Sequence, residues 1–113
     1  MEVSAIPDLP EIRPGDDLGG LISERAELRS SDVVCVASTV VSKAEGRLGD
    51  LDAFPPSERA LAVADRLTEL TGDERDPRFA QAIIEESEEL IIEAPFVLAA
   101  TRFGHITVNA GID

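Results

Sequence analysis

Apolar residues recur at helical spacing in two stretches of the chain, and both stretches have clear end signals. The first lies between Ser57, a cap-forming residue that follows two prolines, and Gly72, a helix-ending glycine. The second opens at Asp76, followed by proline at the first helical position, and runs into an acidic segment at residues 85–89. The pattern predicts two helices; the residues at helical spacing are Leu61, Ala64, Leu67 and Leu70 in the first and Phe79, Ala82, Ile83 and Ser87 in the second.

Shorter apolar runs predict strands. Residues 33–37 read Val-Val-Cys-Val-Ala, a continuous β-branched run typical of a strand buried on both faces. Residues 90–92 begin another strand. Residues 96–101 and 105–109 predict a hairpin joined by Arg-Phe-Gly.

The first third of the chain is less regular. Residues 2–6 predict a short strand that Pro7 ends. Asp16 predicts the cap of a helix that two glycines weaken; its apolar positions are Leu18, Leu21, Ile22 and Leu28. Residues 39–47 predict a loop. Together the elements predict a mixed α/β (α+β) domain over residues 1–113, with a small mixed sheet and about three helices.

The charge of the chain is strongly negative. It has 23 Asp plus Glu against 10 Lys plus Arg, a net charge of -13 on 113 residues. Such composition resembles the proteins of salt-loving archaea, in which carboxylates keep the surface hydrated and salt screens their repulsion. An acidic mesophilic protein is the alternative. The absence of a basic footprint excludes nucleic acid as a general partner.

Other features bound the class of protein. Hydrophobic residues make up 43% of the chain, which is too many for a disordered chain. The single cysteine, Cys35, excludes an internal disulfide, and its apolar surroundings predict burial. Neither a membrane-spanning run nor a signal peptide is recognisable, so we expect a cytoplasmic protein.

Lys43 is the only lysine in the chain, and it follows the best predicted strand. A compact ammonium group on a flexible stem suits a phosphate oxygen, and Arg47 lies close by in the sequence. A surface lysine in a turn is the alternative.

The acidic run at 85–89 is better explained as a solvated helix face than as a metal cluster. His105, the only histidine, has no nucleophile pattern beside it and is expected to be structural.

Several stretches taken together resemble a known family. They are Leu-Pro-Glu-Ile at 9–12, Pro-Gly-Asp-Asp-Leu at 14–18, Ser-Thr-Val-Val-Ser-Lys-Ala-Glu-Gly-Arg at 38–47, Pro-Ser-Glu-Arg-Ala at 56–60 and Val-Asn-Ala-Gly-Ile-Asp at 108–113. In this order and spacing the chain closely resembles the amino-terminal part of the coenzyme F420-0:L-glutamate ligase (F420 γ-glutamyl ligase) family. The resemblance covers essentially the whole chain.

The resemblance implies a GTP-dependent ligase that joins L-glutamate to coenzyme F420-0 through an acyl phosphate and then adds a further glutamate by a γ-linkage. It implies Mg²⁺ or Mn²⁺, admits K⁺, and suggests a homodimer. The residues that it implies are Leu9, Pro10, Glu11 and Ile12 as one wall of the GTP site, Ser38 and Thr39 as donors to the nucleotide, Lys43 for phosphate, and Asp113 as a metal ligand.

Two departures from the family are expected to matter. Asp8 stands where a small residue often precedes the Leu-Pro pair, which affects the shape of that wall. The chain ends at Asp113, where family members continue for about as long again. We therefore expect these residues to form half of a site. The alternative function is a non-catalytic module for nucleotide binding or oligomerisation.

Overall fold

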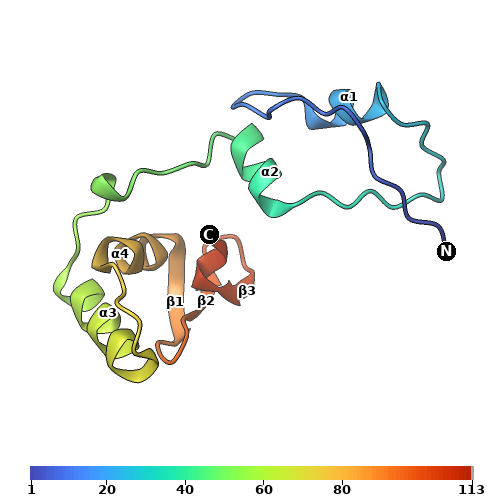
Figure 1. Ribbon diagram of the computed structural model, residues 1–113. Helices are drawn as coiled ribbons and strands as arrows, with labels where there is room; N and C mark the ends of the chain where they lie inside the picture. Colours follow the sequence, from blue (N-terminus) through green and yellow to red (C-terminus); the bar gives the residue numbers. More distant parts are fainter. Residues whose placement is uncertain (113) are drawn as a thin grey trace. The chain divides into compact units, whose positions relative to one another are not determined.

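The computed structural model describes residues 1–112, and its chain divides into two compact units (Figure 1). Unit 1 is Met1–Leu48, and unit 2 begins at Gly49. In residues 1–112, no helix combines the length and the apolar character needed to cross a membrane.

Unit 1 contains two short helices, α1 (Leu18–Ser23) and α2 (Ser38–Ala44), joined by an irregular segment (Figure 1). Asp17 caps α1, accepting a hydrogen bond from the backbone N–H of Gly20 at 3.1 Å. The predicted cap, Asp16, instead accepts from the backbone N–H of Arg13 at 2.7 Å. The prediction of a helix here is thus correct, but its cap is shifted by one residue and Leu28 lies beyond its end.

The end of α2 has a well-defined capping motif. Gly46 has a positive φ of 68° and donates its N–H to the carbonyl of Lys43 at 3.0 Å, while Arg47 donates to the carbonyl of Ser42 at 2.8 Å. These two bonds form a Schellman motif, which closes a helix with glycine in the left-handed conformation. The predicted loop over 39–47 was therefore wrong: most of it is helix, and Gly46 is its stop signal.

The strands predicted for unit 1 were also wrong. Residues 2–6 and 33–37 form no strand, and Val33 keeps 86% of its surface exposed. Cys35 is exposed, contrary to the expected burial. An isolated extended segment cannot satisfy its backbone groups or bury both faces without neighbouring strands. The described part of unit 1 offers no such neighbour.

The helices of unit 2 confirm the predicted pair. A short 3₁₀ turn, η1 (Leu51–Ala53), precedes α3 (Glu58–Thr71) and α4 (Pro77–Glu86). Ser57 caps α3 through the N–H of Ala60, and Gly72 ends it at a φ of 78°. Asp76 caps α4, with proline at its first position. The acidic run at 85–89 is divided between the end of α4 and the following strand.

Three antiparallel strands follow in the order β1 (Ser87–Ile92), β2 (Leu98–Thr101) and β3 (Ile106–Val108). The predicted hairpin is confirmed as β2 and β3. A 3₁₀ turn, η2 (Asn109–Gly111), follows β3. The mixture of helices and strands is confirmed, although the described sheet is purely antiparallel and not mixed.

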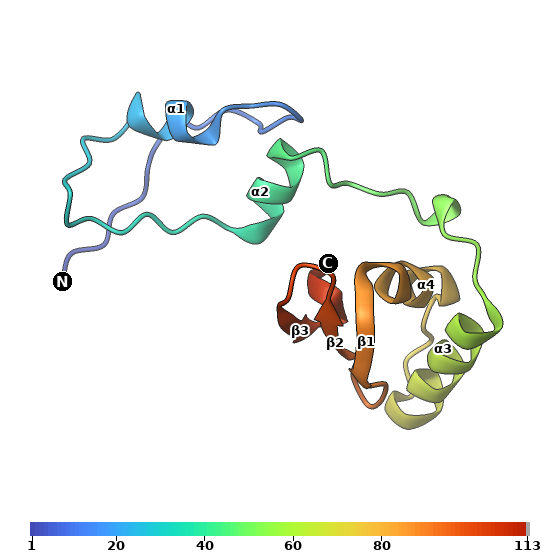
Figure 2. The ribbon, with the colours of Figure 1, turned by 180° about the vertical axis from the view of Figure 1, so that it is seen from behind.

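The core of unit 2 lies between α3, α4 and the sheet; α4 lies beside β1 in the two views of the ribbon, and α3 packs on α4 (Figures 1 and 2). Val97 is 1% exposed and Ile83 is 2% exposed. The buried hydroxyl of Ser87 donates to the carbonyl of Ile83, which satisfies it at the junction of α4 and β1. The remaining core residues are Ala60, Val63, Ala64, Leu67 and Ala80.

Candidate functional site

The two segments of unit 1 that carry most of the predicted nucleotide residues lie together. The Nζ of Lys43 donates to Oε1 of Glu11 at 3.0 Å, across 32 positions of sequence. The backbone N–H of Gly15 donates to the carbonyl of Ala44 at 2.8 Å. The end of α2 is therefore attached to the segment around residues 9–15 by one ion pair and one backbone bond.

Arg25 attaches the preceding residues to α1. Its Nε donates to the carbonyl of Asp8 at 3.0 Å, and its Nη1 donates to the carbonyl of Leu21 at 2.9 Å. These two acceptors are backbone oxygens, and Nη1 also pairs with the carboxylate of Glu24 at 3.3 Å, so this arginine connects the two segments. Arg25 thereby fixes the position of Asp8, which directly precedes residues 9–12.

The ion pair of Lys43 with Glu11 is exposed. The lysine side chain keeps 41% of its surface and the glutamate side chain keeps 76%. Exposed pairs of this kind contribute roughly 0–1 kcal/mol, because water screens them and both side chains lose freedom. Another anion that reaches Lys43 can therefore displace Glu11 at little cost.

Ser38 and Thr39 occupy the first turn of α2 and are exposed. Thr39 and Lys43 are four positions apart, so they lie on the same face of the helix, about 6 Å apart along its axis. Leu9 and Pro10 are also exposed, whereas Ile12 is half-buried. The structure thus brings Glu11 and Lys43 into contact and places Thr39 on the same helix face as Lys43.

Asp113, the predicted metal ligand, lies outside the described residues. Within residues 1–112, no group of three or more His, Cys, Asp or Glu side chains is placed to hold a metal ion. The part of the chain that the structure describes therefore does not form a complete metal site.

Sequence reasoning missed an ionic network at the start of α4. Arg78 donates to the carboxylates of both Asp76 and Asp52, which connects η1 with α4. The hydrogen bonds from Arg78 hold the pKa of Asp76 below its ordinary value, and the same pairing raises the pKa of Arg78. The network stabilises the N-terminus of α4, and no bound group is needed to explain it.

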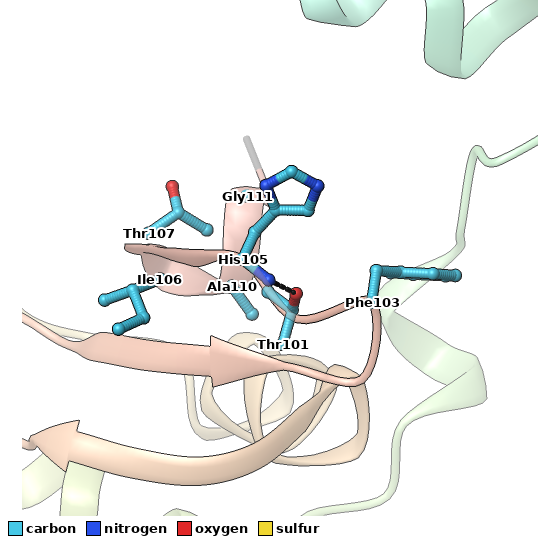
Figure 3. A pocket seen from close by; sticks show the side chains of 7 residues that line it. All are labelled: Thr101, Phe103, His105, Ile106, Thr107, Ala110 and Gly111. Carbon is cyan, nitrogen blue, oxygen red and sulfur yellow. Dashed lines mark hydrogen bonds between the residues drawn. The ribbon is translucent and has the colours of Figure 1, made fainter.

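A shallow hollow lies beside the β2–β3 turn (Figure 3). His105 contributes its backbone to this turn: its N–H donates to the hydroxyl of Thr101 at 3.2 Å, and its carbonyl accepts from the N–H of Thr101 at 2.7 Å. The imidazole is exposed (Figure 3). These bonds use only the backbone of His105, so the structural role expected for its side chain stays a prediction.

The last described residues adopt an uncommon backbone. Asn109, Ala110 and Gly111 all have positive φ, at 51°, 53° and 77°. Alanine rarely adopts this conformation, because its Cβ crowds the backbone. The turn lies within the Val-Asn-Ala-Gly-Ile-Asp string, with Ile112 between it and the predicted metal ligand. Its sequence signals are the asparagine and the glycine.

Comparison of the sequence with protein families identifies the chain. Residues 7–113 match the model of the F420-0:Gamma-glutamyl ligase family, and the chain belongs to that family.

Named relatives are similar over the whole chain. The "Coenzyme F420:L-glutamate ligase" of Halorubrum lacusprofundi is 73% identical over 113 residues, which are 100% of this chain and 45% of that protein. The proteins of the same name from Natronomonas pharaonis and Archaeoglobus fulgidus are 63% and 47% identical, again over 100% of this chain and over 45% and 43% of their own lengths. The chain therefore spans slightly less than half the length of the curated relatives that it matches.

Proposed function

We propose that this chain supplies the amino-terminal, GTP-binding portion of a coenzyme F420-0:L-glutamate ligase. The observation that carries the proposal is the contact between Glu11 and Lys43, because it brings the 9–12 segment and α2 to one place. Membership of the ligase family supports the assignment of these segments to the nucleotide.

In the proposed site, Lys43 receives a phosphate oxygen of GTP in exchange for, or alongside, the carboxylate of Glu11. A lysine ammonium group suits this role because it is a point charge that can turn between acceptors. Thr39, on the same face of α2, and Ser38 in the same turn offer hydroxyl groups to the nucleotide. Residues 9–12 form a wall that orients it, with Leu9 and Pro10 exposed to contact it.

The proposed reaction proceeds in two steps. A carboxylate oxygen of the lactyl tail of coenzyme F420-0 attacks the γ-phosphorus of GTP, the bond to the GDP oxygen breaks, and an acyl phosphate forms. The amine of L-glutamate then attacks the carbonyl carbon, phosphate leaves with the C–O bonding electrons, and the amine proton passes to solvent. A further glutamate is added in the same way through a γ-linkage. Lys43 stabilises negative charge as it moves between the phosphates.

Divalent Mg²⁺ or Mn²⁺ is the cation proposed for the complete enzyme, with K⁺ as an additional ion. Asp113 is proposed as one ligand, since hard cations prefer carboxylate oxygen. The described residues do not supply the remaining donors, so no step is assigned to the metal here. These donors would come from the rest of a full-length ligase, from phosphate and from water. The complete enzyme is further proposed to be a homodimer.

A second candidate is a module that binds nucleotide without chemistry. The observation that favours it is that the chain covers only 45% of its 73%-identical relative. The two candidates differ in turnover and agree in binding. We therefore expect weak GTP binding and no measurable glutamate ligation by the 113-residue chain alone.

The test has two measurements in molar KCl. Calorimetry follows titration of the chain with GTP, with ATP as the matched control. Mass spectrometry then seeks a glutamyl adduct after incubation with GTP, Mn²⁺, L-glutamate and coenzyme F420-0, with a full-length haloarchaeal ligase as the positive control. Turnover by the chain near the full-length rate would contradict the half-site reasoning. Absence of GTP binding by both proteins would refute the proposed nucleotide site.

A further inference from the structure

The sheet of unit 2 has two faces of unusual composition. Cross-strand pairing defines an inner face, the one that meets the helices and η2, with Leu90, Ala99 and Thr107 in one row and Ser87 and Thr101 in another. It also defines an outer face with two rows, Ile92–Leu98–Val108 and Glu89–Ala100–Ile106. Paired residues of an antiparallel ladder point to the same side, so this division follows from the register.

The inner face is covered. Ala99 is 0% exposed and Thr101 is 5% exposed. A Cβ placed on Gly111 would lie 3.7 Å from the methyl group of Thr107, so η2 also packs on this side. Leu90 and Thr107 are half-buried, so most of the inner side is covered.

The outer face is open. Ile106 keeps 66% of its surface exposed and Val108 keeps 49%. Among the described residues, no element covers these two side chains. Ile91, in the irregular part of β1, is also exposed, at 45%.

The polarity of the sheet is the reverse of that expected for one solvated face. In such sheets the inward residues are apolar and the outward residues are polar. Here three of the five inner residues are serine or threonine, the other two being Leu90 and Ala99, whereas five of the six outer residues are apolar. Glu89 is the one charged residue among the six paired outer positions, and Glu88, in the irregular part of β1, is also exposed. Such a face is built to be buried under a further layer.

We propose that the outer face is the docking surface for the remainder of the ligase polypeptide, the part of the full-length protein outside these 113 residues. In the relatives, the part of the chain outside the matched residues is longer than the matched part, since 113 residues are 45% of the Halorubrum protein. That chain is tethered to the unit, so it meets the face at a high effective concentration that a second copy lacks. The partner element carries an apolar surface, because five of the six paired outer residues are apolar. The inference rests on family membership and does not depend on GTP.

Cysteine labelling tests this proposal. In a background with Cys35→Ser, Ile106→Cys is compared with Asp73→Cys, whose native side chain is 80% exposed. Both changes are made in the 113-residue chain and at the aligned positions of a full-length haloarchaeal ligase free of other cysteines. We expect maleimide to react rapidly at both positions of the chain. In the full-length ligase, position 106 should react at least about tenfold more slowly than position 73, because reaction then requires local opening.

The outcomes separate the occupants. Slow labelling of position 106 only in the full-length protein, unchanged on dilution, supports the proposal. Rapid labelling in both proteins overturns it. Labelling of position 106 that slows as the protein concentration rises would identify a second copy as the occupant and would overturn the proposal. Slow labelling of position 106 in the 113-residue chain at every concentration would also overturn the proposal.

A second variant adds a readout that does not use cysteine. Ile106→Glu should leave the melting midpoint of the chain nearly unchanged, since the residue is already in water there. It should lower the midpoint of the full-length ligase by about 5 °C or more, because a charge is then buried against an apolar layer. Equal shifts in the two proteins would contradict the proposal.

Discussion

The ion pair between Lys43 and Glu11 predicts opposite effects of its two members on GTP affinity. Lys43→Ala removes a charged contact to phosphate, which costs about 1.5–3 kcal/mol and weakens binding about 10- to 150-fold. Glu11→Gln removes the carboxylate that competes for the ammonium group. Because the pair is exposed, with 41% and 76% of the side chains accessible, the gain is limited to about 1 kcal/mol, a tightening of up to about fivefold.

The double variant measures whether the two effects share one cause. If Glu11 acts by occupying Lys43, Glu11→Gln should tighten GTP binding less when Lys43 is already alanine. The remaining effect would be repulsion between the Glu11 carboxylate and the triphosphate, which high salt screens. Calorimetric titration with GTP of the four proteins, at low and at molar KCl, gives the coupling energy directly.

Arg47→Ala is the matched control for loss of a positive charge near α2. Arg47 follows Gly46, beyond the last turn of the helix, so its loss should weaken GTP binding less than the loss of Lys43. Equal GTP affinity for wild type and Lys43→Ala would remove this lysine from the site. Weaker binding by Glu11→Gln would refute the competition between carboxylate and phosphate.

Three further predictions concern folding. The melting midpoint should rise between 0.1 and 1 M KCl, because the Debye length falls from about 10 to about 3 Å and salt then screens the repulsion in a chain of net charge -13. An unchanged or lower midpoint would contradict the halophilic interpretation. Val97→Ala should lower the free energy of unfolding of unit 2 by about 1.5–3 kcal/mol in urea, because two methyl groups are lost and a cavity remains. The control is Val33→Ala, at an 86% exposed position, which should change the free energy of unfolding by less than about 0.5 kcal/mol. Equal effects of the two substitutions would refute the assignment of the core. Asp76→Asn should flatten the loss of stability in acid while keeping a cap. Because Arg78 lowers the pKa of Asp76 in the folded protein, the carboxylate stabilises the fold above its ordinary pKa of 3.8, and this contribution disappears as the pH falls through the lowered value. Identical acid-unfolding curves for the wild type and the variant would show that the contact with Arg78 adds no stability.

The sequence of unit 2 determined its elements because their signals are local. Ser57 and Gly72 act at the two ends of α3, and Asp76 acts with Pro77 at the start of α4. A cap interacts with backbone groups within one turn, so its effect can be read without knowledge of the rest of the fold. The short connection of residues 102–104 likewise fixed the pairing of β2 with β3.

In unit 1 the local signals were incomplete. Residues 33–37 have the composition of a buried strand, but a strand exists only where a neighbour accepts its hydrogen bonds, and composition does not say whether one is present. The helix of residues 38–44 contains three β-branched residues, which favour helices weakly. Gly46 did signal its end, through a capping motif that a prediction of a loop overlooked.

The candidate site divides in the same way. The sequence alone supplied the rare lysine and the family strings, and through them the set of residues proposed for GTP. The contact between Glu11 and Lys43, across 32 positions, required the tertiary structure, since spacing along the chain does not fix which loop meets which helix. The open apolar face of the sheet likewise appeared only from the register of β1, β2 and β3, because the side to which a strand residue points depends on its pairing.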